Sequence, residues 1–245
     1  MRILAAFVVG ICFGSFANVL IYRIPKKISI IKPPSSCTSC TKQLGIVEIL
    51  PILGWIFLRG KCKHCKEKIS IRYPLVECTC GLLFGVTFFI SSGISPIFIS
   101  FFAFILLTTA IIDYDTQEIP DGLIATGAVA AVLWVLSGFW IDSLVPHWSN
   151  ALLGSAAGAL PLLFIDRLCI LLVKKDGFGY GDVKLMAVAG LFLGWQNVLV
   201  AFFFAFVLGG IYATYLLITK NAEKGAYIAF APFLCAGSLI SVWFW

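Results

Sequence analysis

Residues 185–219 read LMAVAGLFLGWQNVLVAFFFAFVLGGIYATYLLIT and contain no charged side chain. A helix that crosses a bilayer needs about 20 apolar residues, so this run is too long for a single crossing. Residues 194–197, Gly-Trp-Gln-Asn, supply a turn within it. The run therefore predicts two adjacent membrane-spanning helices and places the chain among membrane proteins.

The composition of the whole chain points the same way. Of its 245 residues, 60% are apolar and 12% are charged, and the mean hydropathy is +1.01. Soluble globular domains carry about 25% charged residues, roughly twice this share. The composition therefore excludes an ordinary soluble protein, a disordered chain and a secreted disulfide scaffold.

Apolar runs of spanning length recur along the chain, and we expect an all-α polytopic membrane protein. It has three expected parts: a first helix at residues 1–22, a four-cysteine loop domain at 23–72, and a seven-helix membrane domain at 73–245. The eight predicted transmembrane helices lie at about 3–22, 74–91, 96–112, 122–141, 150–172, 184–195, 197–218 and 226–245.

The Lys and Arg residues predict the orientation of these helices, because positively charged loops stay in the cytoplasm. Residues 23–72 contain eleven Lys and Arg and only two acids, Glu48 and Glu67. With this loop in the cytoplasm, the alternation of eight spans places both termini on the outer side of the membrane. Topology and contact with anionic lipid then explain the net charge of +6, so we expect no nucleic-acid partner. The same topology also places on the cytoplasmic side the later residues Lys174, Lys175, Lys220 and Lys224, and it places Arg167 and Lys184 near that face.

The loop contains two CxxC pairs, Cys37-Thr-Ser-Cys40 and Cys62-Lys-His-Cys65, with 21 residues between them. This spacing is typical of a closed tetrahedral zinc site with a structural role. A loop of this size buries little apolar surface, so bound Zn²⁺ can supply folding free energy. A thiol redox pair and a metal-free loop are the alternatives. We expect His64 to be exposed rather than a ligand.

Two acidic stretches lie near predicted spans on the cytoplasmic side, where an ionisable group at membrane depth is costly. They are residues 110–121, AIIDYDTQEIPD, and residues 177–184, GFGYGDVK. Asp182 follows three alternate glycines and serves there either as a helix N-cap or as a catalytic group. Asp121 is expected to cap the helix that follows Pro120.

Asp113 and Asp182 form the candidate catalytic pair. Two carboxylates that meet at a membrane boundary can share one proton, because like charges a few ångströms apart do not both ionise. One then acts as a base toward water, and the other protonates the departing amide nitrogen. The chain has only two histidines, no HExxH motif and no pattern that indicates a catalytic triad. By elimination, hydrolytic chemistry is assigned to the two aspartates.

The chain resembles the type IV prepilin peptidases, which are GxGD-type membrane aspartic proteases of pilus, type II secretion and competence systems. A Gly-x-Gly-Asp motif alone is weak, but its order after a four-cysteine loop is specific. The matching segments are Gly14-Ser-Phe-Ala-Asn18-Val, Tyr22-Arg-Ile-Pro25, the four cysteines, Arg72-Tyr-Pro-Leu-Val-Glu77, Ile112-Asp113 through Ile119-Pro120-Asp121, and Gly179-Tyr-Gly-Asp182-Val-Lys-Leu-Met.

This resemblance implies a location in the bacterial cytoplasmic (inner) membrane and a specific activity. The family's two catalytic acids match Asp113 and Asp182. Its members cleave the basic leader of prepilins and pseudopilins after a glycine on the cytoplasmic side. Many then methylate the new N-terminal residue, often Phe, with S-adenosylmethionine as the donor. The resemblance thus implies prepilin substrates and this methyl donor, whereas the residues that bind the donor and the oligomeric state are left open.

Other functions stay open at this stage. A general intramembrane protease of the GxGD type is one alternative, and a transporter or membrane assembly protein without enzymatic activity is another. Glu77 either orients the cysteine loop, takes part in methyl transfer or pairs with Arg72. Three Gly-x₃-Gly motifs, beginning at residues 81, 154 and 190, are expected to pack helices inside the bundle rather than to form a substrate groove.

Overall fold

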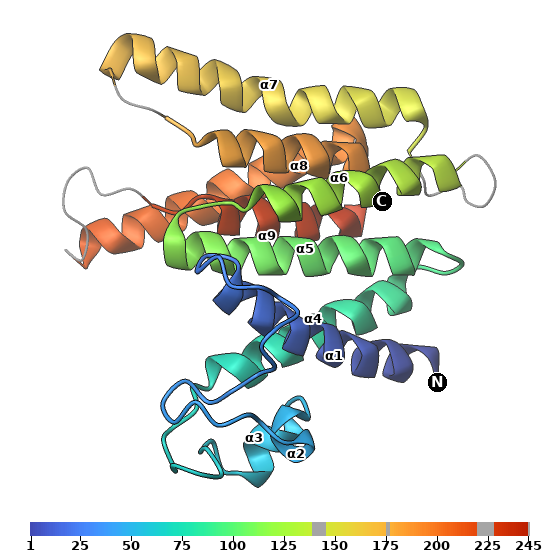
Figure 1. Cartoon of the computed structure of the whole chain (residues 1–245). Coiled ribbons are helices and arrows are strands. Elements are labelled where there is room, and N and C mark those ends of the chain that lie inside the picture. The colour runs from blue at the N-terminus through green and yellow to red at the C-terminus, as the bar shows by residue number, and fades with distance from the viewer. Residues whose placement is uncertain (139–145, 175–176, 220–227, 245) are drawn as a thin grey trace. The chain divides into compact units, whose positions relative to one another are not determined.

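The computed structural model describes residues 1–138, 146–174, 177–219 and 228–244 (Figure 1). Within these ranges the regular elements are helices, and two isolated β-bridges lie in the cysteine loop. Several predicted features lie outside the described residues: Lys175, Lys220, Lys224, Trp245 and the parts of predicted spans at 139–141 and 226–227.

The first of two compact units comprises Met1–Ser92 with Ile99–Phe104. Helices α1 (Arg2–Arg23) and α4 (Arg72–Ile90) pack against each other. Their backbones approach closely at Gly14, where an added Cβ would lie 2.6 Å from the Cα of Glu77. Two short helices, α2 (Ile46–Ile49) and α3 (Leu53–Phe57), lie in the loop between them.

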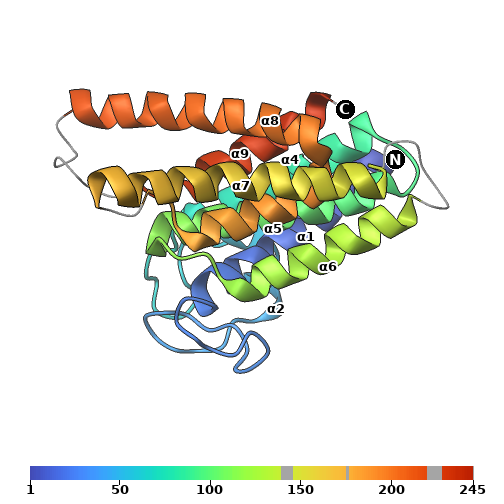
Figure 2. The same ribbon diagram turned by 90° about the horizontal axis from the view of Figure 1, so that it is seen from above.

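Helix α5 (Ser95–Thr116) belongs to both units. The second unit comprises Gly93–Phe98 and Ile105–Trp245. Its further helices are α6 (Asp121–Ser137), α7 (Trp148–Val173), α8 (Tyr180–Ile218), α9 (Ala231–Ser241) and the 3₁₀ turn Val242–Phe244. Helix α8 is central to this unit, because it contacts α6, α7 and α9 (Figure 2).

Helix α8 contains the break that the apolar run predicted, but the break is a kink at one residue rather than a turn of four. Gly194 has φ 76° and ψ 167°, a conformation that L side chains rarely adopt, while the helix continues on both sides. The side chain of Asn150 in α7 accepts a hydrogen bond of 3.1 Å from the N–H of Trp195, which the kink frees. Helix α8 therefore consists of two helical segments that meet at Gly194.

Glycines hold α7 and α8 together. A Cβ at Gly190 would collide with the backbone oxygen of Gly154, and a Cβ at Gly158 would collide with the backbone oxygen of Met186. Such contacts are possible only where no side chain stands between the two backbones. The predicted role of these motifs in internal helix packing is confirmed.

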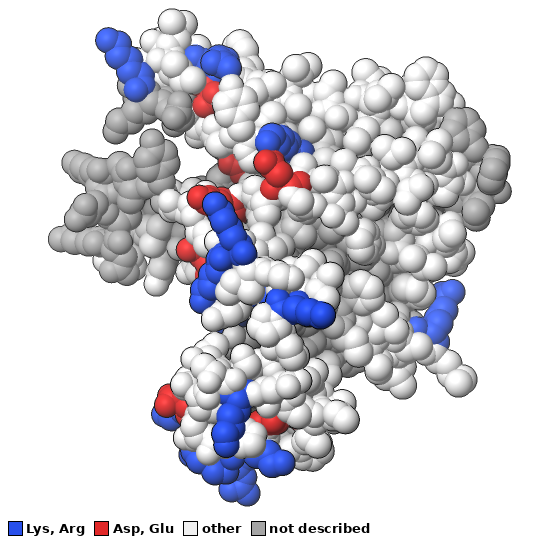
Figure 3. Space-filling view, viewed as in Figure 1, with Lys and Arg blue, Asp and Glu red and all other residues white. Residues whose placement is uncertain are grey.

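Five described helices are long and apolar enough to cross a membrane: Arg2–Arg23, Arg72–Ile90, Ser95–Thr116, Trp148–Leu172 and Tyr180–Ile218. Helices α6 and α9 are apolar but shorter. Figure 3 shows Lys and Arg gathered on the loop between α1 and α4, whereas broad stretches of helix surface carry no charge. The chain is a multi-pass helical membrane protein, and the number of eight spans stays a prediction.

Candidate functional site

Asp113 lies near the end of α5 and is buried, with 6% of its surface exposed. Its Oδ2 atom accepts a hydrogen bond of 3.2 Å from the backbone N–H of Ala231, the first residue of α9. The contact joins two segments that are 118 residues apart in the sequence. One carboxylate oxygen of Asp113 is thereby held in place by the start of α9.

Asp182 lies in the first turn of α8. The N-cap of this helix is Gly179, and no side-chain hydrogen bond caps it. The Oδ1 atom of Asp182 is buried and has no hydrogen-bond partner among the described residues. Its carboxylate is close enough to Asp113 for the two charges to interact. The structure therefore gives Asp182 no capping role and brings the two predicted acids together.

Close backbone packing produces this approach. A Cβ at Gly181 would lie 2.9 Å from the Cβ of Ile119, so the glycine-rich start of α8 fits against the segment that follows α5. The thiol of Cys235 in α9 is buried and interacts with both aspartates. Helices α5, α8 and α9 thus each contribute a group to the site.

Asp166 is a residue that the sequence analysis missed. It is 5% exposed in α7, and its Oδ1 atom accepts hydrogen bonds from the N–H groups of Gly177 (3.0 Å) and Phe178 (3.3 Å). It therefore holds the glycine segment that leads to Asp182. The sequence contains a sign of its importance: Asp166 lies inside the predicted span at residues 150–172, where a charged side chain is costly and marks a functional candidate.

We expect Asp166→Ala to slow peptide-bond cleavage by about tenfold to a hundredfold, because the N–H groups of Gly177 and Phe178 lose their acceptor. Each lost hydrogen bond costs about 0.5–1.5 kcal/mol of the free energy that holds this segment in place. Asp166→Asn keeps an acceptor oxygen and is expected to retain most of the activity. Initial cleavage rates of both purified variants check this. Equal cleavage rates for the Asp166→Ala and Asp166→Asn variants would show that the Asp166 side chain does not position the segment before Asp182.

The other acids near the pair do not join it. Asp121 was expected to be an N-cap, and this is wrong: Pro120 occupies the N-cap position, and Asp121 is the first residue of α6. Its exposed carboxylate instead pairs with the Nζ of Lys184 in α8 at 2.7 Å. Glu118 is exposed. Asp121 thus links α6 to α8 through an ion pair, and Glu118 lies on the surface.

The two CxxC pairs form matching turns. The N–H of Cys37 donates to the oxygen of Lys42 at 2.9 Å, and the N–H of Cys62 donates to the oxygen of Glu67 at 2.9 Å. Each turn closes with one residue of positive φ, Thr41 at 58° and Lys66 at 62°. Two equivalent turns that present sulfur atoms to a common point are typical of a structural zinc site.

The four sulfur atoms of Cys37, Cys40, Cys62 and Cys65 lie within 4.8 Å of one another, and Cys37 and Cys65 are 3.8 Å apart. Zn–S bonds of about 2.3 Å in a tetrahedron place sulfur atoms about 3.8 Å apart, so the cluster fits Zn²⁺. His64 is exposed, as predicted, and the cluster consists of the four cysteines.

The pKa values of two of the thiols, Cys37 and Cys65, move in opposite directions. The N–H groups of Cys40 and Ser39 lower the pKa of Cys37 to about 6. The N–H of Glu67 favours the thiolate of Cys65, but desolvation and the other three cysteines raise its pKa to about 12. A divalent metal ion resolves this conflict, because it stabilises several thiolates at once.

We expect the purified protein to contain close to one zinc ion per chain, and Cys37→Ser to lose it, because the site then lacks one ligand. Cys12 is exposed on α1, so Cys12→Ser is the matched control and keeps the metal. Elemental analysis by mass spectrometry measures both. Full zinc content in the Cys37 variant would contradict a four-cysteine site.

Glu77 anchors the cysteine loop to α4. It is 7% exposed, and its Oε2 atom accepts a hydrogen bond of 2.7 Å from the N–H of Ile52. This contact supports the first of its three predicted roles, the orientation of the loop. Arg23 adds a second anchor, because it donates hydrogen bonds to the oxygens of Ser29 (2.8 Å) and Pro33 (2.7 Å).

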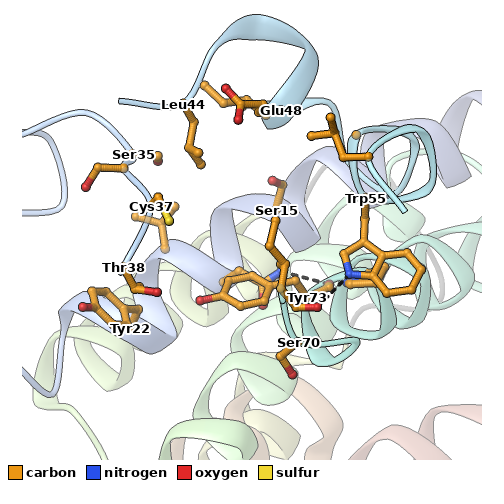
Figure 4. A pocket seen from close by; sticks show the side chains of 18 of the residues that line it. Ser15, Tyr22, Ser35, Cys37, Thr38, Leu44, Glu48, Trp55, Ser70 and Tyr73 are labelled. Atoms are coloured by element: carbon orange, nitrogen blue, oxygen red, sulfur yellow. Dashed lines mark hydrogen bonds between the residues drawn. The ribbon is translucent and has the colours of Figure 1, made fainter. Parts of the chain in front are cut away.

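A cavity of about 590 Å³ lies between the ends of α1 and α4 and the loop (Figure 4). It is a second candidate site, contained within the first unit. Its wall includes polar, acidic and aromatic side chains: Ser15, Asn18, Glu48, Trp55, Tyr73 and Glu77.

Two family models match the chain. The one described as Bacterial Peptidase A24 N-terminal domain matches residues 8–91, which lie within the first unit. The one described as Type IV leader peptidase family matches residues 100–214, which include both aspartates. No solved structure matches significantly.

Curated relatives are similar over nearly the whole chain. Three of them are each named Prepilin leader peptidase/N-methyltransferase. The protein of Bacillus subtilis is 35% identical, with 96% of this chain and 91% of the relative covered. That of Pseudomonas putida is 32% identical over 97% and 88%, and that of Neisseria gonorrhoeae is 32% identical over 97% and 91%.

Proposed function

The chain belongs to the type IV leader peptidase family, and from this we propose that it cleaves the basic leader from type IV prepilins and pseudopilins and then methylates the new N-terminus. The observation that carries the peptidase activity is the approach of Asp113, which is buried, to Asp182, whose Oδ1 atom is buried. Helices α5 and α8 bring these two residues together from positions 69 residues apart in the sequence. The relatives' printed names pair the same two activities.

The two aspartates perform the hydrolysis as a general base and a general acid. One carboxylate removes a proton from water, and the oxygen of that water attacks the carbonyl carbon of the scissile peptide bond. The other carboxyl group gives its proton to the departing nitrogen as the C–N bond breaks. The Oδ2 of Asp113 is held by a backbone N–H, and the Oδ1 of Asp182 has no hydrogen-bond partner among the described residues, which suits a pair that must hold a water between them.

The sides of the membrane follow from charge. The positive-inside rule places the cysteine loop in the cytoplasm, because this loop holds eleven of the 18 Lys and Arg. Asp113 and Asp182 lie at the ends of helices that the same alternation places on this face. Cleavage after the glycine that ends a short basic leader then occurs on the cytoplasmic side.

Methyl transfer requires S-adenosylmethionine, which supplies an activated methyl group when it is bound. The chain's contribution is to bind this donor and the new N-terminal amine and to exclude water. Zinc has no step in either reaction, because four cysteine ligands fill a tetrahedral site and leave no open position. We assign it the folding of the loop.

Co-expression with a type IV prepilin, followed by mass spectrometry of the pilin N-terminus, tests both activities at once. We expect a chain that begins after the leader glycine and carries the added mass of one methyl group. A prepilin that stays intact, although the protein is present in the membrane, would overturn the peptidase proposal. A cleaved but unmethylated pilin would overturn the transferase proposal alone.

A generic apolar membrane helix serves as the specificity control in the same cells. A general intramembrane protease would cut it, whereas a leader peptidase leaves it intact. Cleavage of the control helix at a rate similar to that of the prepilin would replace the proposed substrate class with a broader one.

A further inference from the structure

We propose that the cavity of the first unit is the binding site for the methyl donor, S-adenosylmethionine. This inference rests on the proposed methyltransferase activity and deepens it, because it names the residues that hold the donor. The cavity volume of about 590 Å³ falls in the range of roughly 300–1,000 Å³ that small-molecule sites occupy.

The acidic side chains of the cavity match the positive groups of the donor, which are a sulfonium and an ammonium. The Oε2 atom of Glu48, in α2, accepts a hydrogen bond of 2.8 Å from the N–H of Gly45. Its Oε1 is buried and has no hydrogen-bond partner among the described residues. A buried carboxylate oxygen without a partner is costly, and a bound cation removes this cost. Glu77 lies in the same wall.

The aromatic side chains provide a surface for the adenine ring. Trp55 donates its indole N–H to the oxygen of Ile69 at 3.1 Å and packs against Gly60, so its ring is held in the wall. Tyr73 enters from α4. The ring of Tyr22 is already covered by the Nζ of Lys26 at 3.7 Å. Trp55 and Tyr73 are therefore assigned to the base.

The lining also explains sequence motifs that the peptidase site leaves without a role. Ser15 and Asn18 belong to the motif of residues 14–19, and Tyr73 and Glu77 belong to the motif of residues 72–77. Neither motif contributes to the aspartate pair, which lies in the other unit. Arg23 and Lys68 add positive charge to the wall, which suits the carboxylate of the donor.

Equilibrium dialysis of tritium-labelled S-adenosylmethionine against the purified, zinc-loaded full chain in detergent tests the assignment. Ser15 points into the cavity (Figure 4), so Ser15→Leu fills it and is expected to abolish measurable binding. Glu48→Gln keeps an acceptor for Gly45 but removes the charge, and is expected to weaken binding about tenfold, the loss of one charge-assisted hydrogen bond.

Two variants are the matched controls. Cys12→Leu adds the same bulk to an exposed position of the same helix, and Glu118→Gln neutralises an exposed acid of the other unit. Both are expected to bind the donor as the unchanged protein does. Zinc content and unfolding temperature establish that all four variants are folded. Binding unchanged in both lining variants, or no binding by the unchanged protein, overturns the assignment.

Photo-crosslinking of the labelled donor to the unchanged protein needs no variant. Label on peptides that contain Trp55 or Tyr73 supports the site, and label confined to residues 105–244 overturns it. The pilin assay separates this inference from the proposed function. If the protein binds the donor in the cavity but does not methylate pilin, the methyltransferase function is refuted and the binding site stands. If the protein methylates pilin but the photo-crosslinked label lies outside the cavity, the binding site is refuted and the methyltransferase function stands.

Discussion

Asp113→Asn and Asp182→Asn are each expected to reduce leader cleavage by about a thousandfold or more. General acid–base catalysis contributes about 10²–10⁴ per group, and an amide neither removes a proton from water nor donates one to the leaving nitrogen. The two groups act as a unit, so the double variant is expected to lose little more than either single variant. Initial rates on a purified prepilin in detergent measure the effect.

Glu118→Gln is the matched control for these variants. It removes one carboxylate from the segment that follows α5, but its side chain is exposed and outside the pair. We expect it to cleave at the unchanged rate. Methylation of a pilin that has already been cleaved is expected to survive in both Asn variants, which shows that they are folded. Normal cleavage by either Asn variant would refute the aspartate mechanism.

Gly190→Ala is expected to destabilise the protein by about 3 kcal/mol, the upper range for overpacking a well-packed interior. The new Cβ would collide with the backbone of Gly154 in α7, and a backbone has no rotamer that avoids it. The unfolding temperature in detergent should fall by roughly 10 °C, since 1 kcal/mol corresponds to about 2–4 °C for a chain of this length. The fluorescence of the seven Trp residues reports the transition.

Gly210→Ala is the control in the same helix, because a Cβ there has open space around it. The change replaces glycine with the best helix former, so we expect equal or slightly higher stability, by up to about 1 kcal/mol. If both alanine variants unfold at the same temperature, the contact between α7 and α8 is not a packing constraint.

The sequence alone was sufficient where a property depends on local composition. The apolar run at residues 185–219 predicted two adjacent spanning helices, and the structure has one apolar helix that Gly194 divides into two segments. The break was predictable because hydrophobic length depends on consecutive residues. The CxxC spacing predicted the four-cysteine cluster, because each pair forms its turn within a few residues. In the same way, the Gly-x₃-Gly motifs indicated close helix packing.

Other features depend on contacts between residues that are far apart in the sequence. That Asp121 pairs with Lys184 instead of capping α6 depends on a contact across 63 residues, which no local pattern contains. The same holds for Ala231, whose N–H fixes Asp113, and for Asp166, which holds the segment before Asp182. The cavity has the same origin, since its wall combines residues of α1, the loop and α4.

The sequence by itself thus determined that this chain is a helical membrane protein with a four-cysteine loop and two candidate acids, because hydropathy, charge and ligand spacing are local quantities. Only the tertiary structure decided that Asp113 and Asp182 meet, and that Glu48, Trp55 and Glu77 surround one cavity. These juxtapositions depend on how closely helix backbones approach one another. That approach is decided by the packing of distant glycines and side chains, such as Gly181 against Ile119.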